Sequence, residues 1–466
     1  MTQLSITKPM KTIFKNILIA ALALSFSSCN DFLDREPISQ ITPEEYFNSE
    51  TNANAAVIGL YRTMLNSFSF GQSFIIVPEF SAGHVSHASE YPEYENFRTN
   101  SPQVNNPWTN NMWQAAYTSI NTANNIITSV PEMAGNLIAE EKKQQFVGEA
   151  KFVRALNYFF LVRAFGDIPL KITATTEGED FNIPRSPVNE VYAQIITDLE
   201  EASTSLPDTD ADDATRKGRA TKLAAKALLA KVQLYNAKTS GDYTQAATLA
   251  QEVINSGQFV LVPDFASIWA TENTAESIFE LQFDDQATNP LAMVSNDNAS
   301  MLFYARGTAA FDKYTVEDKR RDFTVKTGET EGRYYIGKYP KFSPANQNFP
   351  VIRIAELYLI HAEAQARMDG AVSASAFNSY KAVRDRAGLA SPTADSFATV
   401  EDFVKEIQKE KERELMFEGE AWFDFCRTEL ALTDMMVKPD RNYFLYPIPS
   451  GQIVLSNGIL TQNPGY

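Results

Sequence analysis

The strongest constraint on the fold is a series of helical segments with one apolar face, several of which follow one another as closely spaced pairs. Between residues 149 and 165, large apolar side chains recur at the spacing of a single helix face. Gly166 ends this segment and Pro169 follows, which is typical of a helix C-terminus. Segments 220–235 and 246–254 are rich in small residues, so two antiparallel helices could approach each other closely. The pattern predicts helical hairpins.

The rest of the pattern is also mainly helical, and predicted strands are few. A second pair of helices is expected at 353–367 and 373–387. Alternating residues predict a strand at 277–283 and a weaker one at 333–336. We therefore predict an all-α dominated chain in which tetratricopeptide-type hairpins stack into a short right-handed superhelix, although the match to that repeat is loose. Single helices are further expected at 52–65, 112–130 and 187–199.

Four long stretches lack a clear helix or strand pattern, namely 66–111, 170–186, 284–350 and 428–466. Loops of this length in a compact domain are usually functional or disordered. These stretches contain most of the aromatic residues that look exposed, so we interpret them as functional.

The N-terminus has the features of a secretory signal. Lysines precede the apolar run 17–24, and small residues 25–28 lead to Cys29. The run is too short to cross about 30 Å of hydrocarbon as a mature helix. A cysteine at the cut resembles the lipobox of bacterial lipoproteins, in which Cys29 would become the acylated N-terminus of the mature protein. The alternative is an ordinary signal peptide with an incidental cysteine.

The charge of the chain excludes some partners. There are 41 Lys and Arg against 58 Asp and Glu, which gives a net charge of −17. Removal of residues 1–28 takes away three lysines and no acid, which leaves −20. Such a surface argues against nucleic acid and disfavours polyanionic glycans, because like charges repel over long range at low salt. If Cys29 is acylated, Cys426 stands alone in an apolar segment, and we expect a buried thiol rather than a disulfide or a nucleophile.

Catalytic and metal-binding patterns are weak. The sequence has no G-x-S-x-G, H-E-x-x-H or Gly-rich phosphate loop. His84 and His87 could supply half of a metal site, but no third imidazole or cysteine accompanies them, so we interpret them as a polar loop pair. His361 lies in an apolar helix and is expected to pack in the core. We predict no catalytic residue, no metal site and no cofactor.

An acidic run at 208–213 invites a calcium interpretation. An EF-hand needs glycine at its sixth position and glutamate at its twelfth, where this chain has Asp213 and Arg219. We favour a solvated loop between helices, and weak calcium binding stays open.

A carboxylate cluster at 411–420 raises the question of glycoside hydrolysis, which uses two carboxyl groups about 5–5.5 Å apart in retaining enzymes. The glutamates occur in a charged helical pattern that ends near Gly419. We interpret them as ion-pair scaffolding.

Eight segments follow one another in an order that spans almost the whole mature chain: 29–37, 149–155, 161–170, 351–356, 383–389, 412–419, 445–449 and 462–466. Together they resemble the SusD/RagB family of lipoproteins of Bacteroidetes. The resemblance implies an α-helical fold with four tetratricopeptide-like hairpins and a large irregular ligand-binding half with a few short strands. It also implies a lid over a SusC-like TonB-dependent outer-membrane transporter, which captures glycans or, in some branches, peptides, and is not an enzyme.

The resemblance also suggests a division of the chain. Residues 1–28 would be the lipoprotein signal peptide and 29–50 the lipidated N-terminus and tether. Residues 51–466 would form one SusD-like domain, into which the binding loops 66–111 and 284–350 are inserted. The acids in 31–36 resemble signals that send such lipoproteins to the cell surface.

Aromatic residues in two loops are the candidates for ligand binding. A sugar ring stacks its apolar face on an aromatic ring, while its hydroxyls need polar partners at the edge. The loops 84–108 and 302–314 hold that mixture, although each aromatic alone could simply pack its loop. Trp113 and Tyr117 share a helical face with core residues and are assigned to the core. The candidates for glycan binding are His87, Tyr91, Tyr94, Phe97, Arg98, Trp108, Tyr304, Arg306, Phe311 and Tyr314.

We therefore predict a lipid-anchored protein of the outer membrane that faces the cell exterior, binds neutral oligosaccharides or polysaccharides and delivers them to the transporter. Three alternatives remain open: a RagB-like receptor for peptides, a structural subunit without a ligand, and a surface glycosidase. The identity of the sugar, its linkage and its chain length do not follow from the sequence.

Overall fold

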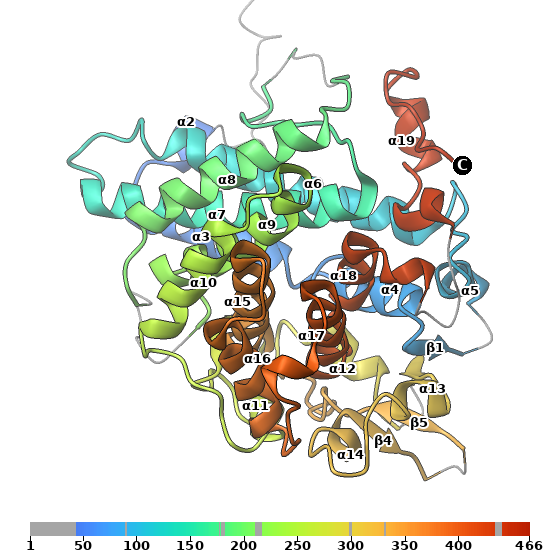
Figure 1. Cartoon of the computed structure of the whole chain (residues 1–466). Helices are drawn as coiled ribbons and strands as arrows, with labels where there is room; N and C mark the ends of the chain where they lie inside the picture. The colour runs from blue at the N-terminus through green and yellow to red at the C-terminus, as the bar shows by residue number, and fades with distance from the viewer. Residues whose placement is uncertain are drawn as a thin grey trace, which may run out of the picture. The chain divides into compact units, whose positions relative to one another are not determined.

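The computed structural model describes residues 43–88, 91–176, 178, 182–209, 217–297, 301–329, 332–433 and 440–466. Residues 1–46 and 47–466 form separate units; in the first, the described part is the single turn α2 (Pro43–Tyr46). The second unit is a row of helices with short two-stranded sheets (Figure 1). Within the described residues, no helix combines the length and apolar character that a membrane span requires.

The predicted helical hairpins form the row. Neighbours in sequence pack against each other from α6 to α10, and α10 then packs against α15, which also contacts α16 and α17. These long helices, packed one against the next, confirm the prediction of a helix-dominated chain. The helices of the row are α3 (Glu50–Thr63), α6 (Pro107–Ser129), α7 (Glu140–Phe165), α8 (Val188–Ser205), α9 (Lys222–Ser240), α10 (Thr244–Asn255), α15 (Ile354–Asp369), α16 (Ala374–Arg386) and α17 (Val400–Leu415).

Local sequence explains where these helices begin and end. The Thr221 side chain accepts a hydrogen bond from the backbone N–H of Ala224 and caps α9 at its start. Gly241 ends the same helix with a φ of 73°, a conformation that favours glycine. Helix α7 contacts α3, α6, α8 and α9, and it is buried on nearly all sides in its second half. It is therefore the central helix of the row.

The strands pair across long distances in sequence. The predicted strand β2 (Ser277–Leu281) is confirmed and pairs antiparallel with β6 (Phe349–Arg353). The weaker candidate is confirmed as β5 (Tyr334–Ile336), which pairs antiparallel with β4 (Val325–Thr327). The third pair joins β1 (Val85–His87) to β3 (Phe303–Ala305).

The stretch 66–111 is not irregular, which corrects the sequence interpretation. It contains α4 (Ser73–Ser81), in which every residue is buried, and α5 (Pro92–Arg98). A fully buried helix shows no polar face, and Pro78 within α4 also argues against a helix, so periodicity could not reveal it. Other short elements in the stretches interpreted as loops are α12 (Pro290–Val294), α13 (Gly307–Phe311), α14 (Arg321–Thr324), α19 (Ser450–Leu455) and 3₁₀ turns at Leu430–Leu432 and Arg441–Phe444. Outside those stretches lie α11 (Ser267–Ala270), α18 (Ala421–Thr428) and a 3₁₀ turn at Ala394–Ser396.

A network of buried ion pairs joins the helices to the connecting segments. Glu414 lies within 2.9 Å of nitrogens of Arg320 and Arg353 and also pairs with Arg386. Arg353 in turn pairs with Glu418 at 2.7 Å. These contacts confirm that the glutamates of 411–420 serve as ion-pair scaffolding.

Candidate functional site

The two loops that the sequence singled out lie side by side because β1 and β3 form an antiparallel ladder. Ser86 lies opposite Tyr304, and the Tyr304 hydroxyl donates a hydrogen bond to the carbonyl of His87 at 2.7 Å. The backbone N–H of Arg306 donates to the carbonyl of His84 at 2.7 Å and extends the ladder by one bond. Figure 1 shows β1, α5 and α13 close together at the right of the molecule.

Helix α5 sorts its side chains between solvent and core. Tyr94 and Phe97 are three residues apart and both are buried, whereas Glu95 and Arg98 are partly exposed. Nε of Arg98 donates to Glu95 at 2.6 Å. This hydrogen bond and the Arg98 charge lower the pKa of Glu95, so it is a carboxylate at neutral pH.

Tyr94 is the centre of an aromatic cluster rather than a ligand contact. Its ring stacks on Phe80 with centroids 5.1 Å apart and on Trp108 with centroids 4.6 Å apart. Tyr91 and Phe303 also lie against it, at 6.3 and 5.1 Å. Tyr94 therefore fixes the positions of the aromatic residues around it.

Three predicted contacts are thus placed in the core, where a ligand on the surface does not reach them. Tyr94 and Phe97 are fully buried, and Phe97 packs edge-on against Tyr446 at 5.4 Å. Tyr314 is also buried, and its hydroxyl donates to the carbonyl of Arg413 at 2.8 Å. For these residues, loop packing was the better interpretation.

Seven candidates for glycan binding remain, and Phe311 differs from the other six in its surroundings. Phe311 is half-buried and packs against Tyr334, with the Arg321 guanidinium 3.8 Å from its ring centroid. Tyr91 is 43% exposed, and the remaining members are half-buried. We call Tyr91 and these five half-buried residues together the β1–β3 surface: His87, Tyr91, Arg98, Trp108, Tyr304 and Arg306.

An ion cluster anchors this surface from below, and the sequence interpretation missed it. His84 is buried rather than a polar loop residue: Nδ1 lies 2.6 Å from Glu79 and Nε2 lies 3.0 Å from Glu412. Lys313, which follows α13, also pairs with Glu412 at 2.7 Å. One carboxylate of α17 thereby holds both loops.

Both nitrogens of His84 face carboxylate oxygens, so both donate and the ring is a cation. Burial would lower the pKa of His84, but the charges and hydrogen bonds of Glu79 and Glu412 outweigh it and raise this pKa to about 9. Burial would likewise raise the pKa of Glu412, but His84 and then Lys313 lower it to about 2. His84 and Glu412 are therefore both charged at neutral pH.

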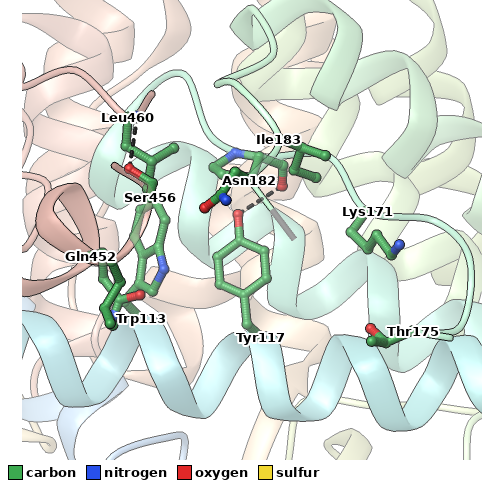
Figure 2. Close-up of a pocket in the computed structure, with 11 residues that line it drawn as sticks. Trp113, Tyr117, Lys171, Thr175, Asn182, Ile183, Gln452, Ser456 and Leu460 are labelled. Atoms are coloured by element: carbon green, nitrogen blue, oxygen red, sulfur yellow. Dashed lines mark hydrogen bonds between the residues drawn. The ribbon is translucent and has the colours of Figure 1, made fainter. Parts of the chain in front are cut away.

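A separate pocket of about 270 Å³ lies beside α6 (Figure 2). Trp113 is buried as predicted, whereas Tyr117 is only half-buried and donates its hydroxyl to the carbonyl of Pro169 at 2.7 Å. Pockets for drug-sized ligands measure about 300–1,000 Å³, so this one suits a small group rather than a sugar chain. Its lining is Trp113, Tyr117, Pro169, Lys171, Thr175, Asn182, Ile183, Gln452, Leu455, Ser456 and Leu460.

Within the described residues, the other candidate side chains are not gathered into a metal site. Within the described ranges, no three or more His, Cys, Asp or Glu side chains gather as metal ligands would. Asp208 pairs with Lys222 at 3.0 Å, and the rest of the acidic run at 210–213 lies outside the described residues, as does Cys29. His361 is buried and bonds Ser379 at 2.8 Å, as expected of a core residue.

Comparison with known proteins relates the chain to one family. A family model described as "Starch-binding associating with outer membrane" matches residues 31–234, and the "SusD family" model matches residues 312–438. Together they cover most of the chain. It belongs to the SusD/RagB family. This membership confirms the resemblance found in the sequence.

Individual SusD-like proteins match along nearly their full length. SusD-like protein P2 of Formosa agariphila is 28% identical, over 97% of this chain and 99% of the relative. A solved structure described as a laminarin binding SusD-like protein is 26% identical, with a TM-score of 0.75 over 90% of this chain and 100% of its own. Surface glycan-binding protein A from Bacteroides thetaiotaomicron, in complex with laminarihexaose, shares the fold at 19% identity, with a TM-score of 0.74 over 89% of this chain and 100% of its own. The fold is SusD-like, and these two solved structures are described as glycan-binding proteins.

Proposed function

We propose that this SusD-like protein binds oligosaccharides on the β1–β3 surface and delivers them to a SusC-like TonB-dependent transporter, without catalysing a reaction. The observation that carries the proposal is the β1–β3 ladder, which brings aromatic and polar side chains from two distant loops to one place. Tyr91 and Trp108 both pack against Tyr94. Partly exposed rings held by a buried ring suit the apolar face of a sugar.

The polar residues of the same surface suit the rest of a sugar. Arg98 and Arg306 supply N–H donors to the same surface that carries Tyr91, Trp108 and Tyr304. The glutamates at 412–420, by contrast, are buried in ion pairs: Glu412 and Glu414 face cations on more than one side. That arrangement supports binding rather than glycoside hydrolysis. The net charge of −17, or −20 after removal of residues 1–28, favours glycans without dense negative charge.

The combined substitution of Tyr91, Trp108 and Tyr304 by Ala should weaken oligosaccharide binding by about 100-fold or more. The reason is that truncation of a central aromatic contact typically costs about 1 kcal/mol or more, and three such losses approach two powers of ten. Isothermal titration calorimetry with the tightest ligand from a glycan panel that includes laminarihexaose measures this loss.

Two matched controls locate the site. Phe342→Ala removes an aromatic ring that is 43% exposed elsewhere, and Leu455→Ala changes the pocket of Figure 2 at a residue that is 71% exposed. Both variants should bind like the wild type. Loss of binding in Leu455→Ala alone would transfer the site to that pocket. Binding of mixed peptides but of no glycan in the panel would replace the proposal by a peptide receptor.

We further propose that acylated Cys29 anchors the protein to the outer membrane, facing the cell exterior. Cys29→Ala should abolish incorporation of a labelled fatty acid and release the protein from the membrane fraction, because acylated Cys29 is the proposed attachment to the lipid. Cys426→Ala is the control, and it should leave both unchanged. A Cys29→Ala protein that still carries the label would contradict the anchor.

A further inference from the structure

Arg306 is an unusual residue on the β1–β3 surface. It follows β3 and precedes α13, and its side chain is half-buried. Nη1 of its guanidinium is buried from solvent without a hydrogen-bond partner, and a Cβ added at Gly83 would lie 3.3 Å from it. The charge is therefore desolvated at Nη1 without a compensating partner, whereas Nε and Nη2 are not buried in this way, so a ligand would contact the guanidinium through them.

Other buried or half-buried arginines in the described ranges have partners. Arg98 bonds Glu95, and Arg163 pairs with Glu420 at 2.7 Å. Within the described ranges, the Arg306 guanidinium forms no hydrogen bond or ion pair, in contrast to every other buried or half-buried arginine. A charged group in such a place ordinarily has a counterion, because desolvation without one is costly.

The carboxylate that could serve Arg306 is already engaged. Glu95 accepts from Arg98 and lies 3.5 Å from Nε2 of His87. Burial, and then the positive charge of Arg98, lower the pKa of Arg306, so the site favours an added negative charge. The planar guanidinium presents N–H donors in a fork that matches a carboxylate or a sulfate.

We infer that Arg306 receives an acidic substituent of the glycan, a carboxylate or a sulfate ester, on an otherwise neutral chain. This inference rests on the proposed glycan-binding function. It agrees with the overall negative charge, since a single acid pairs with Arg306 locally while a densely charged polymer is repelled as a whole. The structure thereby assigns a class of ligand: sparsely acidic glycans, such as neutral backbones with occasional uronic acids.

The test compares matched oligosaccharides on the mature protein by calorimetry. The probes are xylo-oligosaccharides with and without a glucuronic acid branch, the branched form after its carboxyl group has been reduced to an alcohol, and sulfated and desulfated forms of one galactan oligosaccharide. An acidic probe should bind about 10- to 100-fold more tightly than its neutral counterpart, as expected of charge-assisted hydrogen bonds. The pair that shows the difference distinguishes carboxylate from sulfate.

Arg306→Gln and Arg306→Lys complete the experiment. Arg306→Gln should remove the preference for the acidic probe over its neutral counterpart, whereas Arg306→Lys should keep part of the preference. Arg306→Gln should also leave the melting temperature at or above the wild-type value, because the guanidinium has no partner to lose in the free protein. A merely structural role would lower it.

A failure of the Arg306 inference can be distinguished from a failure of the proposed glycan-binding function. Neutral probes that bind as tightly as acidic ones, with Arg306→Gln weakening both equally, would overturn the inference and leave glycan binding intact. If no oligosaccharide of either kind binds, the proposed function itself fails.

Discussion

Glu414→Gln should lower the free energy of unfolding by about 3–5 kcal/mol, the range found when one partner of a buried ion pair is removed. Glu414 is fully buried and faces Arg320, Arg353 and Arg386. Burial would raise its pKa, but the three guanidinium groups hold it well below the usual value, so the native group is a carboxylate. The neutral amide would leave three buried cations with too little negative charge.

Urea unfolding followed by circular dichroism measures this loss as a lower transition midpoint. Glu401→Gln is the matched control: the Glu401 side chain is 75% exposed and makes one surface pair with Arg367 at 3.2 Å. The control should change stability by less than about 0.5 kcal/mol. Equal midpoints for the two variants would show that the network does not hold the fold.

Stability should fall by about 3 kcal/mol as the pH rises from 6.5 to 9, owing to His84 alone. The pKa of His84 is raised from 6.5 in the unfolded chain to about 9 in the folded protein. Because the folded state binds the proton more tightly, its contribution is complete below pH 6.5 and is lost as the pH passes through about 9. Deprotonation would leave Glu79 and Glu412 without their shared cation, directly beneath the β1–β3 surface.

The His84 contribution is isolated as the difference between the wild type and His84→Gln, measured by urea unfolding at a series of pH values. The difference should be largest below about pH 6.5 and shrink toward pH 9 and above. His361→Gln serves as the control, because the pKa of His361 is lowered by burial and this ring therefore gives no stabilising proton uptake in that range. A wild-type advantage that stays constant from pH 6.5 to 9.5 would refute a charged His84.

The helical row could be predicted from sequence because its signals are local. Ala-rich spacing predicts a helix at 220–235 without any knowledge of its neighbours, and the structure extends it as α9 to Ser240. Helix α4 could not be found in this way, because burial on every side removes the polar face on which periodicity depends. The pairing of β1 with β3 joins Val85 to Ala305, a separation that no local pattern encodes.

In the candidate site, too, the sequence could not show which single side chains are buried and which are exposed. Aromatic and polar composition selected two loops that β1 and β3 bring together, but Tyr91 and Tyr94 look equivalent in sequence and differ completely in exposure. Which ring turns inward depends on Phe80 and Phe303, which belong to other elements. His84 looked like a polar loop residue because one of its two carboxylate partners, Glu412, lies far away in the chain.

A crystal structure of the mature protein with its tightest-binding oligosaccharide tests the β1–β3 surface most directly. We expect sugar rings in contact with Tyr91, Trp108 and Tyr304, with hydroxyl groups bonded to Arg98. A sugar bound in the pocket of Figure 2, or anywhere that leaves these aromatic rings untouched, would contradict the assignment of the site.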